Sequence, residues 1–408
     1  MTTSRCRRAV WLAGILSSVP GLLSAAPLFT TPTAPPWTAA AARALSAVRG
    51  SPLTAGAYRV EVAADAVDAA TPRLEFRIGP AAVQARRVGG RRLGNGDVVW
   101  QGVLEDARAA GAQAGEVMTV VRAGARVTAA LRHRGQLYRL IPLEDGGHVL
   151  QHVDESRLPP MHPVAGPPSP SATPALAGAV ASPPPATSTI RVLAVATEQA
   201  VAGYAGDMRS LVQLALAEGN RSYAESGLDM RLELADYRVT SYRESGNMSL
   251  DLRRLQSPDD GVMDAVHAWR DHQRADVVVL VLDRGVACGE AAEIGASAAT
   301  AFAVVLGDCA SGSYTLAHEI GHLQGARHDI GRDPGSVPFA FGHGYWYQPP
   351  RALGWRTVMS YDCPTGCRRI PRWSSPALTH EGVPAGTPGQ ADNRRVLDLT
   401  RAVIAGFR

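Results

Sequence analysis

The chain has 408 residues, which is long enough for two domains beyond a short leader. Its formal net charge of +4 is small for this length, and its arginines are dispersed without interleaved aromatic residues, so we expect no nucleic acid partner. Beyond the amino-terminal stretch no segment is long and apolar enough to span a bilayer, so we expect no stable membrane anchor.

Residues 1–26 have the pattern of a signal peptide. Arg5, Arg7 and Arg8 form a basic start, residues 9–23 are largely apolar, and Ser24-Ala25-Ala26 supplies the small side chains of a cleavage site. The sequence therefore predicts export, with the protein secreted into the extracellular medium or periplasmic in transit.

Residues 27–158 are predicted to be a propeptide, and residues 159–188 a linker. The propeptide begins with a loose leader rich in Ala, Pro and Thr. Over residues 57–153 it continues with alternating apolar runs such as Leu74, Phe76 and Ile78, which indicate a small β-rich domain. The linker is dominated by Pro, Ala, Ser and Gly, cannot bury a core, and is a natural site for proteolytic cutting. Because residues 318–328 further along carry the metal-ligand pattern HExxHxxGxxH, this order is typical of a protease zymogen whose own propeptide is its inhibitor; a permanent two-domain protein is the alternative.

Residues 189–408 are predicted to form an α+β or α/β catalytic domain, with a twisted mixed sheet, long helices and a small carboxy-terminal subdomain. We expect a long amphipathic helix over 198–225, a strand over 228–239 and a second helix over 262–274. The apolar run over 276–283 predicts a central strand with both faces buried, and residues 299–306 predict another strand. Ser311 or Ser313 is expected to cap the next helix, and residues 392–407 predict a final helix.

The stretch from His318 to His328 has the pattern HExxHxxGxxH. On a helix, His318 and His322 project from one face and can bind one Zn²⁺ through their imidazole nitrogens. Gly325 allows the left-handed turn that ends this helix and brings His328 to the same metal as a third ligand. Three protein ligands leave one coordination position open, which is typical of a catalytic zinc ion, and Glu319 can then take a proton from a metal-activated water.

This motif resembles that of the metzincin zinc endopeptidases, and Asp329 directly after it is similar to the adamalysin branch. In metzincins a methionine turn lies beneath the zinc site, and Val358-Met359-Ser360 stands at a suitable distance to supply it through Met359. Tyr361 stands two residues later, as in the astacin and serralysin branches, which implies a hydrogen bond to the developing oxyanion. The resemblance also implies that an edge strand before the zinc helix pairs with extended peptide, and residues 299–304 are the candidate.

Arginines gather after the methionine turn, in the segment that by the same resemblance forms the wall of the pocket for the residue just past the cut. Arg368, Arg369 and Arg372 can clamp a substrate carboxylate bidentately, and a solvated basic loop is the alternative. The stretches 319–328, 356–364 and 392–397 resemble the bacterial peptidyl-Asp metalloendopeptidases. The resemblance implies cleavage on the amino side of aspartate, in protein or peptide substrates with acidic residues, and leaves open which arginine meets the aspartate.

Four cysteines remain once Cys6 leaves with the signal peptide, and an even number favours disulfides in an exported protein. Nearness in sequence favours the pairs Cys288–Cys309 and Cys363–Cys367, although three pairings are open. No cysteine lies between Cys6 and Cys288, so a thiolate of the propeptide cannot be the inhibitory zinc ligand.

Together these patterns predict a secreted zinc endopeptidase made as a zymogen, with one catalytic Zn²⁺ and Glu319 as general base. The propeptide would inhibit through Asp154, Glu155 or His162 as a zinc ligand, or by steric blocking of the cleft. The sequence neither requires nor excludes Ca²⁺. Two other functions stay open, namely a catalytically inactive zincin-fold module that captures extended peptides, and a zinc hydrolase for a non-peptide bond such as a deacetylase.

Overall fold

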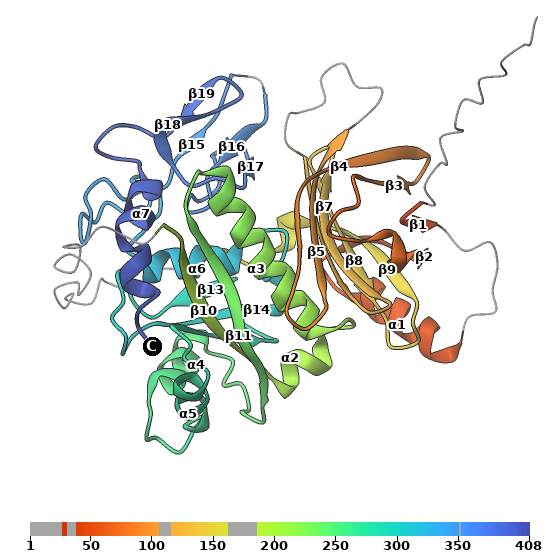
Figure 1. The fold of residues 1–408 in the computed structure, drawn as a ribbon, viewed down its shortest axis with the longest axis horizontal. Helices are drawn as coiled ribbons and strands as arrows, with labels where there is room; N and C mark the ends of the chain where they lie inside the picture. The colour runs from red at the N-terminus through yellow and green to blue at the C-terminus, as the bar shows by residue number, and fades with distance from the viewer. Residues whose placement is uncertain (1–26, 31–37, 106–115, 162–185, 351) are drawn as a thin grey trace, which may run out of the picture.

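Two β-sheets of different connectivity organise the chain, and the two halves that they form pack against each other (Figure 1). The computed structural model describes residues 27–30, 38–105, 116–161, 186–350 and 352–408. The predicted signal peptide and residues 162–185 of the predicted linker lie outside the described residues.

The amino-terminal half contains a nine-stranded antiparallel sheet, as the alternating apolar runs predicted, with the order β1-β2-β9-β8-β7-β6-β5-β4-β3. The N–H of Leu28 donates to the carbonyl of Glu75 at 2.6 Å, so the two ends of the sheet approach each other around a core that includes Trp100. The strands are β1 (Phe29–Thr30), β2 (Thr54–Val62), β3 (Arg73–Ile78), β4 (Ala81–Arg92), β5 (Val98–Glu105), β6 (Val117–Ala123), β7 (Arg126–His133), β8 (Gln136–Pro142) and β9 (His148–Val153).

A helix that the sequence did not predict, α1 (Ala39–Gly50), contacts β2. Thr38 caps it by accepting a hydrogen bond from the N–H of Ala41 at 3.1 Å, and Leu45 and Val48 are buried. Its many alanines leave only a weak apolar period, which is why composition indicated a loose leader there.

The carboxy-terminal half is built on a five-stranded sheet with the order β11-β10-β12-β14-β13. The first four are parallel, and β13 is antiparallel to β14. All six residues of β12 are buried, as its continuous apolar run predicted. The strands are β10 (Ser188–Thr197), β11 (Met230–Thr240), β12 (Val277–Leu282), β13 (Gly289–Ala291) and β14 (Phe302–Leu306).

The prediction that residues 299–304 form the edge strand is wrong. β14 lies between β12 and β13, so the short strand β13 forms this edge of the sheet. β13 contains only three residues and begins with a glycine, so it carries no apolar alternation that a sequence pattern can detect.

Helices α2 (Glu198–Gly203) and α3 (Met208–Glu225) replace the single helix predicted over 198–225. The chain breaks at Tyr204, and Asp207 caps α3 by accepting a hydrogen bond from the N–H of Ser210 at 2.7 Å. Helix α5 (Ala265–His272) lies within the predicted range 262–274, whereas α4 (Met248–Gln256) was not predicted.

Helix α3 joins the two halves, because it packs on β11 and on the zinc-motif helix α6 (Thr315–Leu323) and also on β5, β6 and β7 (Figure 1). Gln101 donates from Nε2 to the carbonyl of Ala217 at 2.7 Å, and Arg221 donates from Nη1 to the carbonyl of Gly102 at 2.8 Å. The interface between the halves is therefore hydrogen-bonded as well as apolar.

The segment after α6 forms two small sheets and a final helix close to the predicted one. None of the described helices combines the length and apolar character that a membrane crossing needs. The elements are β15 (Trp346–Tyr347), β16 (Gly354–Arg356), β17 (Cys367–Arg369), β18 (Ser375–His380), β19 (Val383–Ala385) and α7 (Asn393–Ile404).

Candidate metal centre and active site

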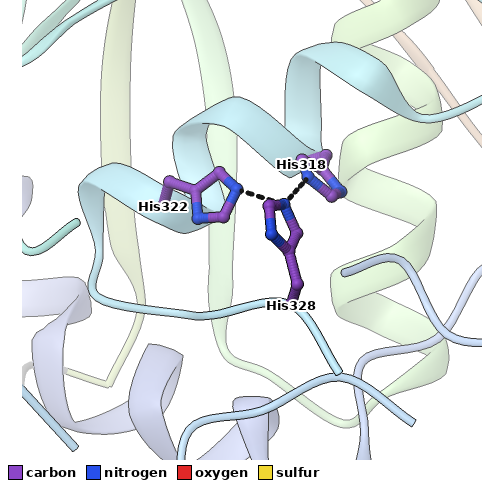
Figure 2. A group of neighbouring side chains, drawn as sticks. All are labelled: His318, His322 and His328. Carbon is purple, nitrogen blue, oxygen red and sulfur yellow. Dashed lines mark hydrogen bonds between the residues drawn. The ribbon is translucent and has the colours of Figure 1, made fainter. Parts of the chain in front are cut away.

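His318 and His322 project from the same face of α6, four residues apart, as the helical period requires (Figure 2). The predicted serine cap is wrong. The residue before the helix is Tyr314, in a left-handed conformation with φ of 61°, and no side chain caps the helix. The hydroxyl of Ser313 instead donates to the carbonyl of Cys309 at 2.6 Å.

Gly325 ends this helix in the left-handed region, with φ of 100°. The N–H of Ala326 donates to the carbonyl of Gly321 at 2.9 Å and closes the turn. A Cβ on Gly325 would come 2.9 Å from Cγ of Pro338, so conformation and space both require glycine. The turn returns His328 to the two helical histidines (Figure 2).

The Nε2 atoms of the three histidines converge, with 3.2 Å between His318 and His328 and 3.0 Å between His322 and His328. Nδ1 of His318 lies 2.8 Å from the carbonyl of Val358, and Nδ1 of His322 lies 2.8 Å from the carbonyl of Ala326. Because a carbonyl only accepts, both rings carry their proton on Nδ1 and direct the Nε2 lone pair to the shared position. Burial lowers the pKa of His322 to about 4, which keeps that ring neutral. Lone pairs this close repel one another unless a cation lies between them, so the donor set fits Zn²⁺.

Met359 is fully buried and packs against α6. Its Sδ lies so close to Gly321 that a Cβ on this glycine would come 3.0 Å from it. Trp373 packs at the same point, with Cη2 2.6 Å from that Cβ position. The neighbouring Val358 carbonyl holds the ring of His318, so this segment both packs beneath the histidines and orients one of them.

Glu319 is fully buried between the histidines and the sheet edge. Its burial, followed by the charge of Glu290, raises its pKa well above the usual range, whereas the charge of Arg369 lowers it. A Cβ on Gly289 of β13 would come 2.5 Å from Oε1 of Glu319, so the carboxyl group lies against the backbone of the edge strand.

The ring of Tyr361 meets the ring of His328 edge-on, with 4.7 Å between the centroids. Burial, followed by the charge of Glu319, raises the pKa of Tyr361, so its hydroxyl keeps the proton that it can donate. The structure thus brings Tyr361 next to the third histidine.

The three arginines predicted to bind substrate have different surroundings. Arg368 is paired with Glu381, and Nε of Arg372 lies 3.8 Å from a carboxylate oxygen of Glu225. Arg369 is only 5% exposed, and its Nη1 donates to the carbonyl of Ser313, two residues before α6. Of the three, Arg369 is therefore the one that contacts the segment leading into the histidine helix.

Both expected disulfides are present, Cys288–Cys309 and Cys363–Cys367. The first links the start of β13 to the loop before α6, and so joins the sheet edge to the histidine helix. Asp362 gathers with the second pair, but those sulfur atoms are bonded to each other and offer no thiolate to a metal.

A cleft of about 670 Å³ lies beside the loop that carries His328, lined by Arg332, Trp346, Tyr361 and Pro364 among other residues. This volume is in the range of ligand-binding clefts. His343, also in its wall, donates from Nδ1 to the carbonyl of His328 at 2.9 Å, a support that the sequence did not predict.

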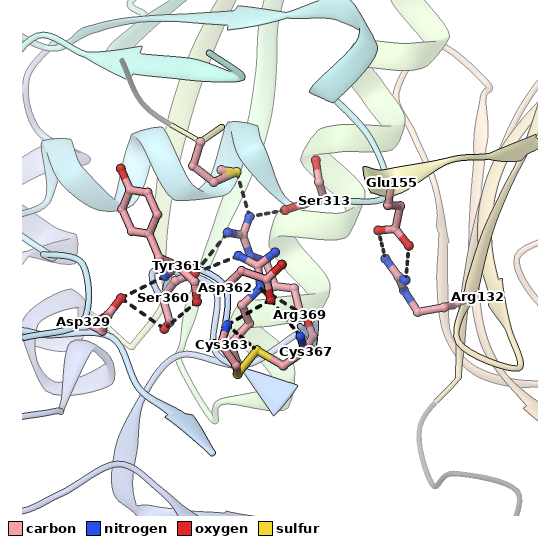
Figure 3. A network of polar contacts seen from close by, with 12 residues as sticks. Arg132, Glu155, Ser313, Asp329, Ser360, Tyr361, Asp362, Cys363, Cys367 and Arg369 are labelled. Carbon is pink, nitrogen blue, oxygen red and sulfur yellow. Dashed lines mark hydrogen bonds and ion pairs between the residues drawn. A yellow bond between two sulfur atoms is a disulfide. The ribbon is translucent and has the colours of Figure 1, made fainter. Parts of the chain in front are cut away.

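The candidate inhibitory ligands Asp154 and Glu155 are engaged elsewhere. Asp154 caps a short 3-10 helix by accepting a hydrogen bond from the N–H of Ser156, and Glu155 binds Arg132 through both carboxylate oxygens at 2.7 and 2.8 Å (Figure 3). His162 lies outside the described residues.

Pro160 and Met161 contact the edge of the sheet, which was not predicted from the sequence. Their carbonyls accept hydrogen bonds from the N–H groups of Cys288 and Gly289 at 2.7 and 3.1 Å. A proline-rich stretch carries no strand signal, so its place along the sheet edge was not readable from the sequence.

Comparison with known proteins agrees with this geometry. The Reprolysin_5 profile of metallo-peptidase family M12 matches residues 186–374. The Peptidyl-Asp metalloendopeptidase of Stenotrophomonas maltophilia (strain R551-3) is 45% identical over 403 residues, which are 96% of each chain. A protein of the same name from Xanthomonas campestris pv. campestris is 46% identical over 386 residues, which are 91% of this chain and 90% of the relative. Another from Pseudomonas fragi is 38% identical over 191 residues, which are 47% of this chain and 100% of the relative. The chain therefore belongs to the peptidyl-Asp metalloendopeptidases, which are zinc metalloendopeptidases.

Proposed function

We propose that this chain is a secreted zinc endopeptidase of the metzincin type, made as a zymogen, that cuts on the amino side of aspartate. The observation that carries the proposal is the convergence of three Nε2 atoms, two of them fixed by Nδ1–H bonds to backbone carbonyls. His318, His322 and His328 would hold one zinc ion and leave a coordination position for the reaction.

When bound, zinc supplies a Lewis acid that polarises the scissile carbonyl and makes water acidic enough to react near neutral pH. Glu319 accepts the proton of the attacking water at a carboxylate oxygen and returns it to the leaving amine. The burial that raises the pKa of Glu319 makes its carboxylate a stronger base than an exposed one. Tyr361 donates a hydrogen bond from its hydroxyl to the oxyanion that develops on the carbonyl.

Latency of the precursor is supported by how the amino-terminal half holds the surroundings of the metal centre. Arg139 donates from Nη2 to the carbonyls of Asp308 and Ser311 at 2.7 and 2.8 Å, in the loop just before α6. Pro160 and Met161 cover the edge strand that lies beside Glu319. Steric blocking by the amino-terminal half therefore fits the contacts better than a zinc ligand from Asp154 or Glu155 does.

An aspartate preference is supported by the name of the relatives and by the basic segment after Met359. Export is supported by the basic and apolar pattern of residues 1–26. The domain boundaries of the proposal are 1–26 for the signal peptide, 27–158 for the propeptide, 159–188 for the linker and 189–408 for the catalytic domain.

The deciding experiment digests a denatured proteome with the matured secreted protein, with and without a chelator, and identifies the new amino termini by mass spectrometry. We expect cleavage that the chelator abolishes and zinc restores, with aspartate as the first residue of the new fragments. Tight binding of unfolded chains without cleavage would instead identify an inactive module that captures peptides. Loss of acetyl groups from lysine would identify a deacetylase.

A further inference from the structure

The guanidinium group of Arg369 is buried, and no carboxylate of the residues that the structure describes forms an ion pair with it. Nη1 donates to the carbonyl of Ser313 at 2.7 Å, Nη2 donates to the carbonyl of Ser360 at 3.2 Å, and among the described residues Nε has no acceptor (Figure 3). No acidic side chain of the described residues forms an ion pair with it. Buried arginines are normally paired with carboxylates because removing the charge from water is costly, so this guanidinium group lacks the direct partner that such groups normally have.

A second cation stands beside the first. Arg356 lies opposite Arg369 in the β16–β17 pairing and donates from Nη1 to the same carbonyl, that of Ser360, at 3.0 Å. Its nearest acidic group is Asp362, 3.8 Å away and 59% exposed. Burial, followed by the charge of Arg356, lowers the pKa of Arg369, and the charges of Asp362, Glu319 and Glu155 offset only part of this. An anion that entered here would relieve both the desolvation and the repulsion.

This pair of cations lies at the reaction centre. Ser313 lies just before α6, and Ser360 directly follows Met359. Because Arg369 donates to the carbonyls of both serines, it links the start of the histidine helix to the segment beneath it. Glu319 lies on the same helix, in the turn that follows its start. A group bound by Arg369 would therefore lie close to the substrate bond for whose hydrolysis Glu319 is the proposed general base.

The atom that now meets Arg369 comes from the amino-terminal half. Sδ of Met161 lies 3.2 Å from Nη1 of Arg369, and the Met161 side chain is only 8% exposed. A thioether is a weak acceptor and carries no charge, so Met161 fills the space without neutralising the cation. The carbonyls of Pro160 and Met161 are held at the same time by the edge strand.

We infer that Arg369, with Arg356 beside it, binds the side-chain carboxylate of the substrate residue that follows the scissile bond, and that Met161 occupies this position in the full-length chain. The inference rests on the proposed endopeptidase function and names the residue that reads the substrate. Arg368 is not that residue because it is paired with Glu381, and Arg372 faces Glu225.

The main test compares two peptides that differ only in Asp or Asn after the scissile bond, using matured wild-type enzyme and the variants Arg369→Gln, Arg369→Lys and Arg368→Gln. In the wild type we expect kcat/KM to favour Asp by at least about a hundredfold, because a site built for a carboxylate rejects the neutral amide. Arg369→Gln should lose most of this ratio, Arg369→Lys should keep part of it, and Arg368→Gln should keep all of it. Zinc content is measured on each variant to separate loss of the metal from loss of selectivity.

The inference is overturned if Arg369→Gln binds zinc and keeps the wild-type ratio, or if Arg368→Gln loses it. A wild-type enzyme that cleaves both peptides equally also overturns it, while the zinc peptidase function stands. A wild-type protein that cleaves neither peptide contradicts the proposed function itself, and the assignment of Arg369 falls with it.

A second test needs no change at Arg369 and therefore survives if Arg369→Gln fails to fold. In the full-length chain carrying Glu319→Gln, Met161 is replaced by Glu, Gln or Lys, and thermal unfolding is followed at pH 8. We expect the Glu variant to unfold at a higher temperature than the isosteric Gln variant, and the Lys variant at the lowest. The reason is that a carboxylate at position 161 would pair with the Arg369 guanidinium group, whereas an ammonium group would repel it. A Glu variant no more stable than the Gln variant would show that Arg369 does not bind a carboxylate there.

Discussion

Asp329 Oδ2 accepts a hydrogen bond from the backbone N–H of Tyr361 at 3.0 Å, and the hydroxyl of Ser360 lies 3.4 Å from the same oxygen. Asp329 follows the third histidine directly, and Tyr361 stands two residues after Met359. One carboxylate, only 6% exposed, thus ties the loop of the third histidine to the segment beneath the metal centre. The position of the His328 ring depends on this link as well as on the turn at Gly325.

Replacing Asp329 should therefore loosen the metal centre. Asp329→Ala leaves the partly buried N–H of Tyr361 without its acceptor, so we expect the free energy of unfolding to fall by about 2 kcal/mol. Zinc affinity should fall by about tenfold, as for other residues that support metal ligands, and Asp329→Asn should recover part of both. Urea unfolding and competition with a chromogenic zinc chelator measure the two effects. Asp398→Ala is the control, because that carboxylate is 46% exposed in its ion pair with Arg401, and an equal loss there would remove the special role of Asp329.

Glu319→Gln should separate chemistry from folding. The amide keeps the size of the side chain and cannot accept the proton, so we expect kcat for a peptide to fall by about a thousandfold or more. Zinc content and the unfolding temperature should stay near those of the parent. The measurement is cleavage of a fluorogenic peptide by zinc-loaded protein, and turnover close to that of the wild type would show that another group acts as base.

Gly321→Ala should destabilise the protein although alanine favours helices. The gain in helix propensity is about 1 kcal/mol, but the new Cβ would come 2.6 Å from Trp373 and 3.0 Å from Met359. Trp373 cannot move away because its indole N–H donates to the hydroxyl of Ser222 at 2.9 Å. Overpacking costs about 1–3 kcal/mol, so we expect a net loss of about 1 kcal/mol or more by thermal unfolding. In Gly50→Ala the added Cβ meets no atom within 4 Å, so that variant should be neutral or more stable.

Stability of the full-length chain should depend on pH through Glu218 on α3. Burial raises the pKa of Glu218 to about 7. The N–H of Gly312 and the charges of Arg139, Arg132 and Arg221 lower this pKa and so offset part of the rise. Because the folded pKa lies above the ordinary value of 4.5, the contribution of Glu218 is fully present below pH 4.5 and is lost as pH rises through about 7.

The measurement is urea unfolding of the Glu319→Gln chain at pH 5 and pH 8, with and without Glu218→Gln. Between these two pH values the chain with Glu218 should lose about 2 kcal/mol more than the Glu218→Gln chain. Parallel pH curves for the two chains would mean that Glu218 ionises as it does in the unfolded state.

Expectations that the structure contradicts share one physical cause. The helix start at Tyr314, the edge strand β13 and the break between α2 and α3 all depend on contacts with distant residues rather than on local period. Tyr314 takes a left-handed conformation at the entry of α6, where a serine cap was expected, because tertiary packing outweighs local preference there.

The amino-acid sequence by itself determined the geometry of the candidate metal centre. The spacing of His318, Glu319 and His322 on a helix, followed by Gly325 and His328, is a local pattern that the helical period and one left-handed turn convert directly into geometry.

Only the tertiary structure decided which arginine faces the metal centre and what lies against it. Arg368 and Arg369 are neighbours in sequence, but alternation along a strand sends one to Glu381 and buries the other against Ser313, Ser360 and Met161. Charge pairing and burial are properties of groups brought together from distant parts of the chain, so composition and spacing cannot assign them.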